Sequence, residues 1–417
     1  MTSNSESATT PTVPRRVMVV YGTRPEAVKM APVIQALGAS PLFHPIVAVT
    51  GQHRSMLDQV NNVFGIHPDI DLDIHHAGQT LTEITTRTLN GLRETLSRLT
   101  PDMVVVQGDT TTTFAAALAA FYEQIPVAHL EAGLRTQDRY SPYPEEINRR
   151  LTTQLASLHL APTPASRANL LAENVAPASI VVTGNTVIDA LVWAVSRQLD
   201  YGDPRLDALD DIAGPVLLVT AHRRESWGEP LRAVGRAVAY IARRHPDLTV
   251  VFPAHLNPLV RDAILPELAD LPNVHVIEPL PYAGFVRLMD RATVILTDSG
   301  GIQEEGPSLG KPVLVMRDTT ERPEAVLAGT ALLVGTDEET VAGAVTALLT
   351  DPAVYAAMTS AVNPYGDGLA AQRTVAALAH YFRLGPPAEQ FVVNLSERDA
   401  PEQRRAADLA YLLEPTP

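Results

Sequence analysis

The chain has 417 residues, of which 46% are hydrophobic and 19% are charged, so it can bury a core and is long enough for two or three domains. Its 32 Lys and Arg against 47 Asp and Glu give a formal net charge of −15, which argues against non-specific binding of nucleic acid or of an anionic membrane surface. There are 0 Cys, which excludes disulfides, Cys-ligated zinc, iron–sulfur clusters and thiol nucleophiles.

Residues 1–14 are rich in Ser and Thr and have no apolar core, so they predict a disordered tail and not a secretory signal. No run of about 18 apolar residues occurs in the sequence, which predicts that nothing spans a membrane. We therefore expect a cytoplasmic protein that binds neither a membrane nor nucleic acid.

Short apolar runs alternate with helical patterns in the next part of the chain. The predicted strands are Val17–Tyr21, Ile46–Thr50, Met103–Gln107 and Val127–Glu131. The clearest helices are Glu26–Leu37 and Thr111–Tyr122. This βα repetition predicts a parallel sheet that is covered by helices on both faces.

A second series of the same kind follows. Its predicted strands are Val216–Thr220, Thr249–Pro253, His275–Glu278, Val294–Thr297, Val313–Met316 and Ala331–Val334. A helix is predicted over about Pro230–Arg244, a surface excursion over Asp200–Pro215, and a helix over Tyr365–Leu384 that can return to the first series.

The pattern predicts an α/β protein with two doubly wound domains and a ligand site in the cleft between them. We expect an N-terminal domain of residues 15–184 plus 365–384 and a C-terminal domain of residues 185–364. Residues 385–417 form an extension to which the sequence assigns no role.

Polar residues gather where the predicted strands of the first domain end. After the first strand, backbone amides at the start of a helix, together with Arg24 and Lys29, would form an anion site. Asp109, Glu131 and Glu145 follow the later strands. Each carboxylate alone can be structural, as an N-cap for example, but three at one edge of a sheet indicate acid–base chemistry.

The second domain shows a comparable set of residues. His222 follows its first strand beside two Arg, which favours an anion contact over the usual capping or core role of a lone His. Ser299, Gly300 and Gly301 precede a helix and would cradle a phosphate. Glu305 lies one turn further on, where a carboxylate can accept hydrogen bonds from two ribose hydroxyls.

Other ligand signatures are missing from the sequence. Asp69, Asp71 and Asp73 alternate, but Ile74 stands where a calcium loop of the EF-hand type needs Gly, so we expect a polar strand face and no metal. Neither a P-loop nor a GxGxxG motif is present, which favours a sugar-nucleotide enzyme over an NTPase or a dehydrogenase.

From about Arg16 to Tyr381 the sequence resembles the non-hydrolysing UDP-N-acetylglucosamine 2-epimerases. The runs that carry the resemblance include GTRPEAVKMAP, QGDTTTT, HLEAGLRT, YPEEINRRL, TAHRRES, PAHLNP and LTDSGGIQEEGPSLGKPVLV. They occur in the family's order, and motifs of this length are highly specific.

The resemblance implies two Rossmann-like domains of the glycosyltransferase-B type, a homodimer, and no cofactor. It also implies which residues act. The matching catalytic positions are Asp109, Glu131, Glu145 and His222. The matching nucleotide-binding positions are Arg24, Lys29, Phe285, Ser299, Gly300, Gly301, Glu305 and Arg322. Gln52, Arg87 and His255 match an allosteric substrate site that many bacterial members have.

The resemblance further implies reversible conversion of UDP-GlcNAc to UDP-ManNAc, by loss of UDP to 2-acetamidoglucal and re-addition. The product would supply a cell-surface polysaccharide or a secondary metabolite. The alternatives are a hydrolysing epimerase that releases ManNAc and UDP, a glycosyltransferase of the same fold, and a non-catalytic sensor of sugar nucleotides. A sensor would be expected to lose one of the catalytic positions, and all four are kept.

Overall fold

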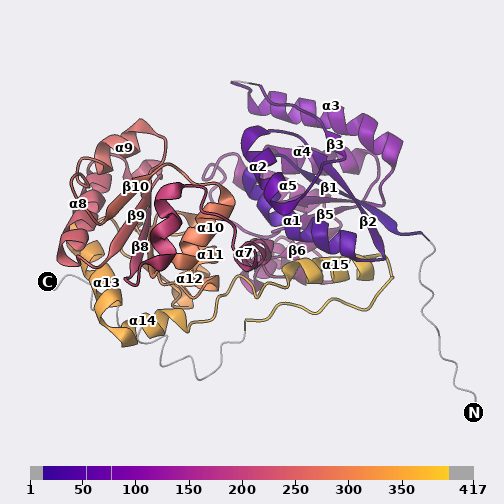
Figure 1. The fold of residues 1–417 in the computed structure, drawn as a ribbon. Coiled ribbons are helices and arrows are strands. Elements are labelled where there is room, and N and C mark those ends of the chain that lie inside the picture. Colours follow the sequence, from indigo (N-terminus) through magenta and orange to yellow (C-terminus); the bar gives the residue numbers. More distant parts are fainter. Residues whose placement is uncertain (1–12, 53, 77, 394–417) are drawn as a thin grey trace, which may run out of the picture. The chain divides into compact units, whose positions relative to one another are not determined.

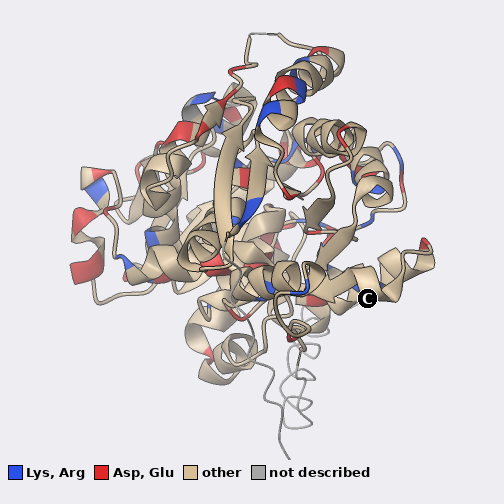
Figure 2. Ribbon diagram, turned by 90° about the vertical axis from the view of Figure 1, so that its right-hand side faces the viewer, with Lys and Arg blue, Asp and Glu red and all other residues tan. Residues whose placement is uncertain are grey.

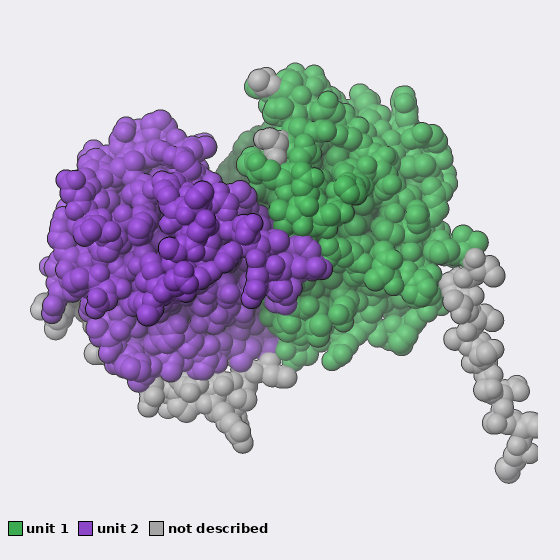
Figure 3. Space-filling view, viewed as in Figure 1, with its two compact units in different colours: residues 1–190, 366–392 green, residues 191–365, 393–417 purple. Residues whose placement is uncertain are grey.

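The computed structural model describes residues 13–52, 54–76 and 78–393, and it divides the chain into two compact units (Figures 1 and 3). Unit 1 comprises the described residues of Met1–Ala190 and Gly366–Val392, and unit 2 those of Leu191–Tyr365 with Val393. The first division falls inside a helix, a few residues after the expected boundary at 184.

Unit 1 is built on a parallel sheet. Among the described residues its seven strands are β1 (Arg15–Tyr21), β2 (Phe43–Val49), β3 (Ile70–Asp71), β4 (Met103–Gln107), β5 (Val127–Leu130), β6 (Leu158–Ala161) and β7 (Ile180–Val182). Their order is β3-β2-β1-β4-β5-β6-β7. β2 and β3 are added on one side of β1 and the later strands on the other, so the strand order reverses between β1 and β4. Such a switch point is where doubly wound sheets bind ligands.

Helices cover both faces of this sheet (Figure 1). They are α1 (Arg24–Ala39), α2 (Arg54–Phe64), α3 (Leu81–Leu99), α4 (Thr111–Tyr122), α5 (Glu145–Leu155), α6 (Pro164–Ala172), the first part of α7 (Thr186–Ser196), which continues into unit 2, and α15 (Ala370–Tyr381). The last is far from the others in sequence, yet it packs against α1 in unit 1. It accounts for the helix expected over Tyr365–Leu384, with shorter ends.

Unit 2 repeats this design. Its strands in the described residues are β8 (Val216–Thr220), β9 (Thr249–Pro253), β10 (Val274–Ile277), β11 (Val294–Thr297), β12 (Val313–Val315) and β13 (Ala331–Leu333). All neighbours are parallel, in the order β10-β9-β8-β11-β12-β13. The helices are α8 (Glu229–Arg244), α9 (Pro258–Ile264), α10 (Tyr282–Arg291), α11 (Gly300–Ser308), α12 (Pro323–Leu327), α13 (Glu338–Thr350) and α14 (Pro352–Thr359).

The strands are almost free of charge, whereas Lys, Arg, Asp and Glu gather on helices and loops (Figure 2). In unit 2, α8, α9 and α13 bury their apolar sides against one face of the sheet, and α10, α11 and α12 bury theirs against the other. Burial on both faces explains why the strands read as continuous apolar runs without alternation. The predicted fold class, two doubly wound parallel α/β domains, is confirmed.

The ends of several predicted strands differ from the structure. The strand expected over Val127–Glu131 stops at Leu130, because Glu131 adopts a left-handed backbone with φ 58°. The segment Asp200–Pro215 has mostly exposed residues, as expected, but its Tyr201, Leu206 and Leu209 are buried in the core of unit 2. Those apolar side chains anchor a segment whose many Asp suggested a surface position.

The two chain ends were expected to be a tail and an extension. Residues 1–12 and 394–417 lie outside the described residues. The first part of the extension lies on unit 1, where Phe391 is buried and its backbone N–H donates to the Val182 carbonyl at 2.8 Å. Gln390 and Phe391 of the extension therefore lie against β7.

Within the described residues, no single helix is both long and apolar enough to cross a membrane. The pair α13 and α14 reaches that length only together, across a bend of 95°.

Candidate active site

The turn after β1 is a compact hydrogen-bonded loop. A β-carbon at Gly22 would lie 2.1 Å from the Thr50 hydroxyl oxygen, so only glycine fits there. The carboxylate of Glu26, in the first turn of α1, accepts from the backbone N–H of Gly22 at 3.0 Å and of Thr23 at 2.8 Å. Arg24 is exposed at the start of this helix. The turn presents a helix N-terminus with one cation beside it, as an anion site requires.

The Thr-rich turn after β4 is tied to the same carboxylate. Glu26 also accepts from the hydroxyls of Thr110 at 2.6 Å and Thr113 at 2.9 Å. Burial raises the pKa of Glu26, and these donors oppose the rise. The Thr run thus has a structural role, since it joins the turns after β1 and β4 and so places Asp109 at the edge of the sheet.

Glu131 lies at the centre of the polar residues in unit 1. It is 8% exposed, and its left-handed backbone turns the chain away from the end of β5. Lys29 of α1 forms an ion pair with its carboxylate, and Gln107 at the end of β4 donates to the same oxygen. The predicted contact of Lys29 with a nucleotide stays a prediction.

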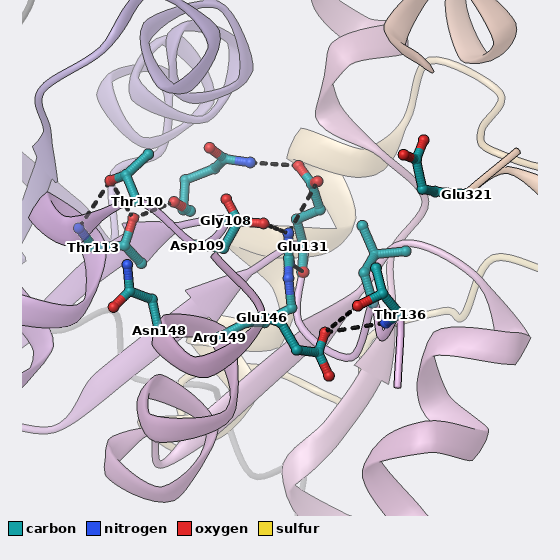
Figure 4. A network of polar contacts seen from close by, with 12 residues as sticks. Gly108, Asp109, Thr110, Thr113, Glu131, Thr136, Glu146, Asn148, Arg149 and Glu321 are labelled. Atoms are coloured by element: carbon teal, nitrogen blue, oxygen red, sulfur yellow. Dashed lines mark hydrogen bonds and ion pairs between the residues drawn. The ribbon is translucent and has the colours of Figure 1, made fainter. Parts of the chain in front are cut away.

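Arg149 of α5 joins two of the predicted catalytic acids (Figure 4). Its guanidinium donates to the carboxylate of Asp109 and to the backbone carbonyl of Glu131, and it lies 3.7 Å from a carboxylate oxygen of Glu131. The Arg149 side chain is 6% exposed. A buried cation of this kind balances two carboxylates that would otherwise repel each other.

Glu145 is the first residue of α5, one helical turn before Arg149. Burial raises the pKa of Glu145, and the nearby Asp109 carboxylate raises it further, while Arg149 acts in the opposite direction. Glu145 is therefore more easily kept protonated than a free Glu carboxyl group. Acid and base roles separate in this way when neighbouring environments push two pKa values apart.

A buried His supports the site from within the sheet. His129 on β5 contacts the backbone carbonyl of Gly108 through Nε2 at 2.6 Å. Burial lowers the pKa of His129 to about 3, so the ring is neutral and Nε2–H donates to that carbonyl. The contact holds the peptide directly before Asp109.

In unit 2, His222 and Asp298 follow the neighbouring strands β8 and β11. Nδ1 of His222 lies 2.8 Å from Oδ1 of Asp298. Asp298 is 1% exposed, and its pKa is lowered, because the His222 contact and two backbone N–H groups outweigh the effect of burial. The His255 ring stacks on that of His222 with centroids 6.0 Å apart.

The N-terminus of α11 has the features of a phosphate site. Ser299 is its N-cap, and Gly300 and Gly301 form its first turn. A β-carbon at Gly300 would lie 3.6 Å from an Arg223 nitrogen and 3.8 Å from a carboxylate oxygen of Glu321, which is the ion-pair partner of Arg223. The structure therefore brings Ser299, Gly300 and Gly301 to a helix N-terminus beside an Arg–Glu pair, and the phosphate contact stays a prediction.

Two further predicted nucleotide-binding residues have protein partners. Arg322 donates to the carboxylate of Glu304, which is 2% exposed in α11. Phe285 on α10 packs against the core of unit 2. Glu305 lies beside Gly301, as its position one turn into α11 predicts. The contact of each with a nucleotide stays a prediction.

The predicted allosteric residues occupy different units. In unit 1, Gln52 accepts from the Thr112 hydroxyl at 2.9 Å, and Arg87 donates to the Ile74 carbonyl at 3.1 Å. His255 belongs to unit 2, where it touches the predicted catalytic His222. Burial, and then His222, lower the pKa of His255.

The sequence predictions missed several residues of the site, among them Gln107, Arg149 and Asp298. Arg149 follows Glu145 at the i,i+4 spacing, at which helical residues meet. Asp298 directly follows an apolar strand, the same signal that singled out Glu131. Gln107 carried no signal beyond its place at the end of a strand.

No cluster of three or more His, Asp or Glu that could hold a metal ion occurs in the described part of the chain. Asp71, one of the alternating Asp, forms an ion pair with Arg54.

Comparison with known proteins gives a consistent result. A family model described as UDP-N-acetylglucosamine 2-epimerase matches residues 35–379. The UDP-N-acetylglucosamine 2-epimerase of Yersinia pestis is 55% identical over 371 residues, which are 88% of this chain and 99% of that protein. The chain thus covers nearly the whole length of this relative.

Solved structures agree. The UDP-GlcNAc 2-epimerase from Neisseria meningitidis, solved bound to UDP-GlcNAc, is 49% identical and superposes with a TM-score of 0.79 over 88% of this chain and 100% of its own. The glycotransferase of kitacinnamycin is 16% identical with a TM-score of 0.58, covering 90% and 100%, and so shares the fold alone. This likeness agrees with the glycosyltransferase-B type; the position of the site in a cleft stays a prediction.

The family model matches most of the chain, and the relative from Yersinia pestis is more than half identical across nearly its full length. The chain belongs to the UDP-N-acetylglucosamine 2-epimerase family.

Proposed function

We propose that the chain catalyses the reversible C2 epimerisation of UDP-GlcNAc to UDP-ManNAc without hydrolysis. The observation that carries this proposal is the Arg149 cation shared between Asp109 and Glu131, with Glu145 at the start of the same helix. Two carboxylates beside a fixed cation, and a third whose pKa is raised, supply both a base and an acid.

The chemistry explains why several acid–base groups are needed. The hydrogen on C2 has no carbonyl next to it, so it cannot simply be removed and returned. Departure of UDP from C1 builds oxocarbenium character, which acidifies that hydrogen. A carboxylate then takes the C2 proton, and 2-acetamidoglucal and UDP remain. A proton delivered to the opposite face of C2, with UDP re-added at C1, gives the epimer.

The leaving diphosphate must be held and its charge balanced. We assign this role to the N-terminus of α11 with Arg223, and to His222. Arg24 at the start of α1 and Lys29, the partner of Glu131, are the cations that unit 1 offers. Glu305 beside Gly301 is assigned to the ribose hydroxyls. The relative from Neisseria meningitidis bound to UDP-GlcNAc supports this ligand class.

Family membership extends the proposal to parts that no contact within the chain supports. These are homodimerisation, a cytoplasmic location, an allosteric substrate site that involves Gln52, Arg87 and His255, and supply of a sugar precursor for cell-surface polysaccharide or a secondary metabolite.

One incubation tests the proposal. The full chain is mixed with UDP-GlcNAc in D₂O, and the products are followed by ¹H and ³¹P NMR. UDP-ManNAc that carries deuterium at C2 is the expected product, because a carboxyl group that took the C2 proton exchanges it with solvent. Glu131→Gln, which keeps the shape but not the proton-transfer group, is the control.

Other products would decide against the proposal. Free ManNAc with UDP would identify a hydrolysing epimerase, which shares the elimination step but lets water capture the intermediate. An unchanged substrate at high protein concentration would refute catalysis on this sugar nucleotide.

A further inference from the structure

Asp298 holds the backbone of the His222 loop as well as facing its ring. One oxygen, Oδ2, accepts from the backbone N–H of His222 at 2.7 Å and of Arg223 at 2.8 Å. The carboxylate is therefore fixed in one orientation, and Oδ1 is the oxygen that faces the imidazole, 2.8 Å from Nδ1.

Oδ1 is buried and has no well-aligned hydrogen-bond donor among the described residues. The Nδ1 atom of His222 already lies at hydrogen-bond distance from it, so a small rotation of the ring would supply the missing donor. Catalytic hydrogen bonds are often poorly aligned until a substrate is present. A buried carboxylate oxygen aimed at one ring nitrogen therefore points to a defined protonation site on that ring.

The two nitrogens of His222 then have different roles. The side chain of His222 is 40% exposed, whereas that of Asp298 is 1% exposed. His255 stacks on the ring and restricts its movement further. If Nδ1–H is committed to Asp298, Nε2 is the nitrogen left for a ligand.

We infer that Asp298 is a positioning residue, which holds His222 in the tautomer protonated at Nδ1 and leaves Nε2 for the substrate. The catalytic meaning of this assignment rests on the proposed function. The tautomer itself does not, because it is a property of the chain without substrate.

The inference predicts that the variant Asp298→Asn changes the tautomer of His222. An Asn side chain has one oxygen and one NH₂ group. The two backbone N–H groups of His222 and Arg223 require an acceptor, so the amide oxygen takes the place of Oδ2. The NH₂ group then faces Nδ1, which must accept, and the proton moves to Nε2. Imposing the wrong tautomer on a catalytic His in this way costs about 10⁴ in kcat in hydrolytic triads.

The tautomer is read by ¹H–¹⁵N correlation spectra of the ¹⁵N-His-labelled chain, recorded at rising pH until the His222 signals no longer shift. The chain has 12 His, and the His222 signals are those that vanish in His222→Gln. We expect Nδ1–H in the natural chain and Nε2–H in Asp298→Asn, together with a fall in kcat of at least about 10² and a smaller change in KM.

Asp351→Asn is the matched control. Asp351 also accepts from two backbone N–H groups in unit 2, those of Ala353 at 2.8 Å and Val354 at 3.3 Å, and it has no hydrogen bond or ion pair with a His among the described residues. This variant should leave both the His222 spectrum and kcat unchanged.

An Nε2–H tautomer in the natural chain would overturn the inference without any variant, which keeps it testable even where Asp298→Asn does not fold. An unchanged tautomer or an unchanged kcat in a folded Asp298→Asn would overturn it as well. A chain that is inactive on UDP-GlcNAc but switches tautomer in Asp298→Asn would refute the proposed function and support the pairing of Asp298 with His222.

Discussion

The guanidinium of Arg149 donates to the carboxylate of Asp109, although the first lies in α5 and the second in the turn after β4. The Arg149 side chain is 6% exposed and that of Asp109 28% exposed, so the pair is shielded from water on the Arg side. Because the same guanidinium also holds the backbone carbonyl of Glu131, it sets the separation of two carboxylates. An Arg that organises two acids is harder to replace than a surface Arg.

We predict that Arg149→Lys lowers kcat strongly while the chain still folds. A Lys ammonium is a point charge without the planar fork of Arg, so it cannot contact Asp109 and the Glu131 carbonyl together. Arg149→Met removes the charge and should also lower the free energy of unfolding by about 3–5 kcal/mol, the cost of breaking a buried ion pair. Turnover of UDP-GlcNAc and chemical denaturation measure the two effects separately.

The control for this pair is Arg93→Met on α3, where the side chain is exposed. A surface change of this kind stays within about 0.5 kcal/mol. Near-normal turnover in Arg149→Lys would show that the shared cation is not needed for proton transfer.

Glu145→Gln should raise stability at neutral pH while it lowers activity. The pKa of Glu145 is raised in the folded chain, so the folded state binds this proton more tightly than the unfolded state does. Stability from this group is then present at low pH and is lost as pH rises above the unfolded Glu pKa of about 4.3. Gln removes the cost of the buried charge, and it also removes a group whose loss should cost about 10² to 10⁴ in rate.

Thermal unfolding midpoints measured from pH 4 to pH 8, compared with those of the natural chain, test this expectation. The increase in the unfolding midpoint of Glu145→Gln over the natural chain should be small at pH 4 and larger toward neutral pH. A variant that is less stable at pH 8 and equally active would mean that Glu145 is a structural residue.

The sheets of both units were predictable because buried parallel strands leave continuous apolar runs separated by helical patterns. β3, β6 and β7 were not predicted, although β12 and β13, with 3 residues each, were. The helix over Thr111–Tyr122 was predicted to the residue, because a run rich in Ala has few competing conformations.

The sequence predicted that the polar residues of the site lie at strand ends, but it did not predict which of them contact each other. Lys29 and Glu131 are 102 positions apart, and nothing local shows that the first binds the second. The partners of Arg149 and Asp298 depend likewise on which strands become neighbours. Only the order of the strands in the sheets shows which polar side chains come close enough to form ion pairs and hydrogen bonds.

Asp189 and Asp367 of unit 1 should respond to pH in opposite directions. Burial raises the pKa of Asp189 to about 6, although it accepts from the backbone N–H of Ala370 and Ala371 at the start of α15. Stability from a raised pKa is present at low pH and is lost between the unfolded Asp value of about 3.9 and about 6. The stability of Asp189→Asn relative to the natural chain should therefore increase as pH rises through this window.

Asp367 forms an ion pair with Arg373 at 2.6 Å, and this contact lowers its pKa. Its stability contribution is present above about pH 3.9 and is lost as pH falls through the lower folded value. Asp367→Asn should therefore be less stable than the natural chain at neutral pH and approach it in acid. Denaturation curves of both variants at a series of pH values test the two signs, and the same trend in both would refute the assignment.

Gly133, in the turn after Glu131, should tolerate no side chain. Its φ is +94°, and a β-carbon there would lie 2.2 Å from the backbone carbonyl oxygen of Ser166. Gly65 also has a positive φ, +65°, but an added β-carbon would have open space around it. A substitution at Gly65 therefore measures the free-energy cost of the left-handed backbone alone. We expect Gly65→Ala to lower the free energy of unfolding by about 1–2 kcal/mol. Gly133→Ala should cost a further 1–3 kcal/mol or so, because the backbone of α6 must move, and it should lower turnover by shifting Glu131. Equal losses in the two variants, measured by chemical denaturation, would show that the turn can move away from α6 without strain.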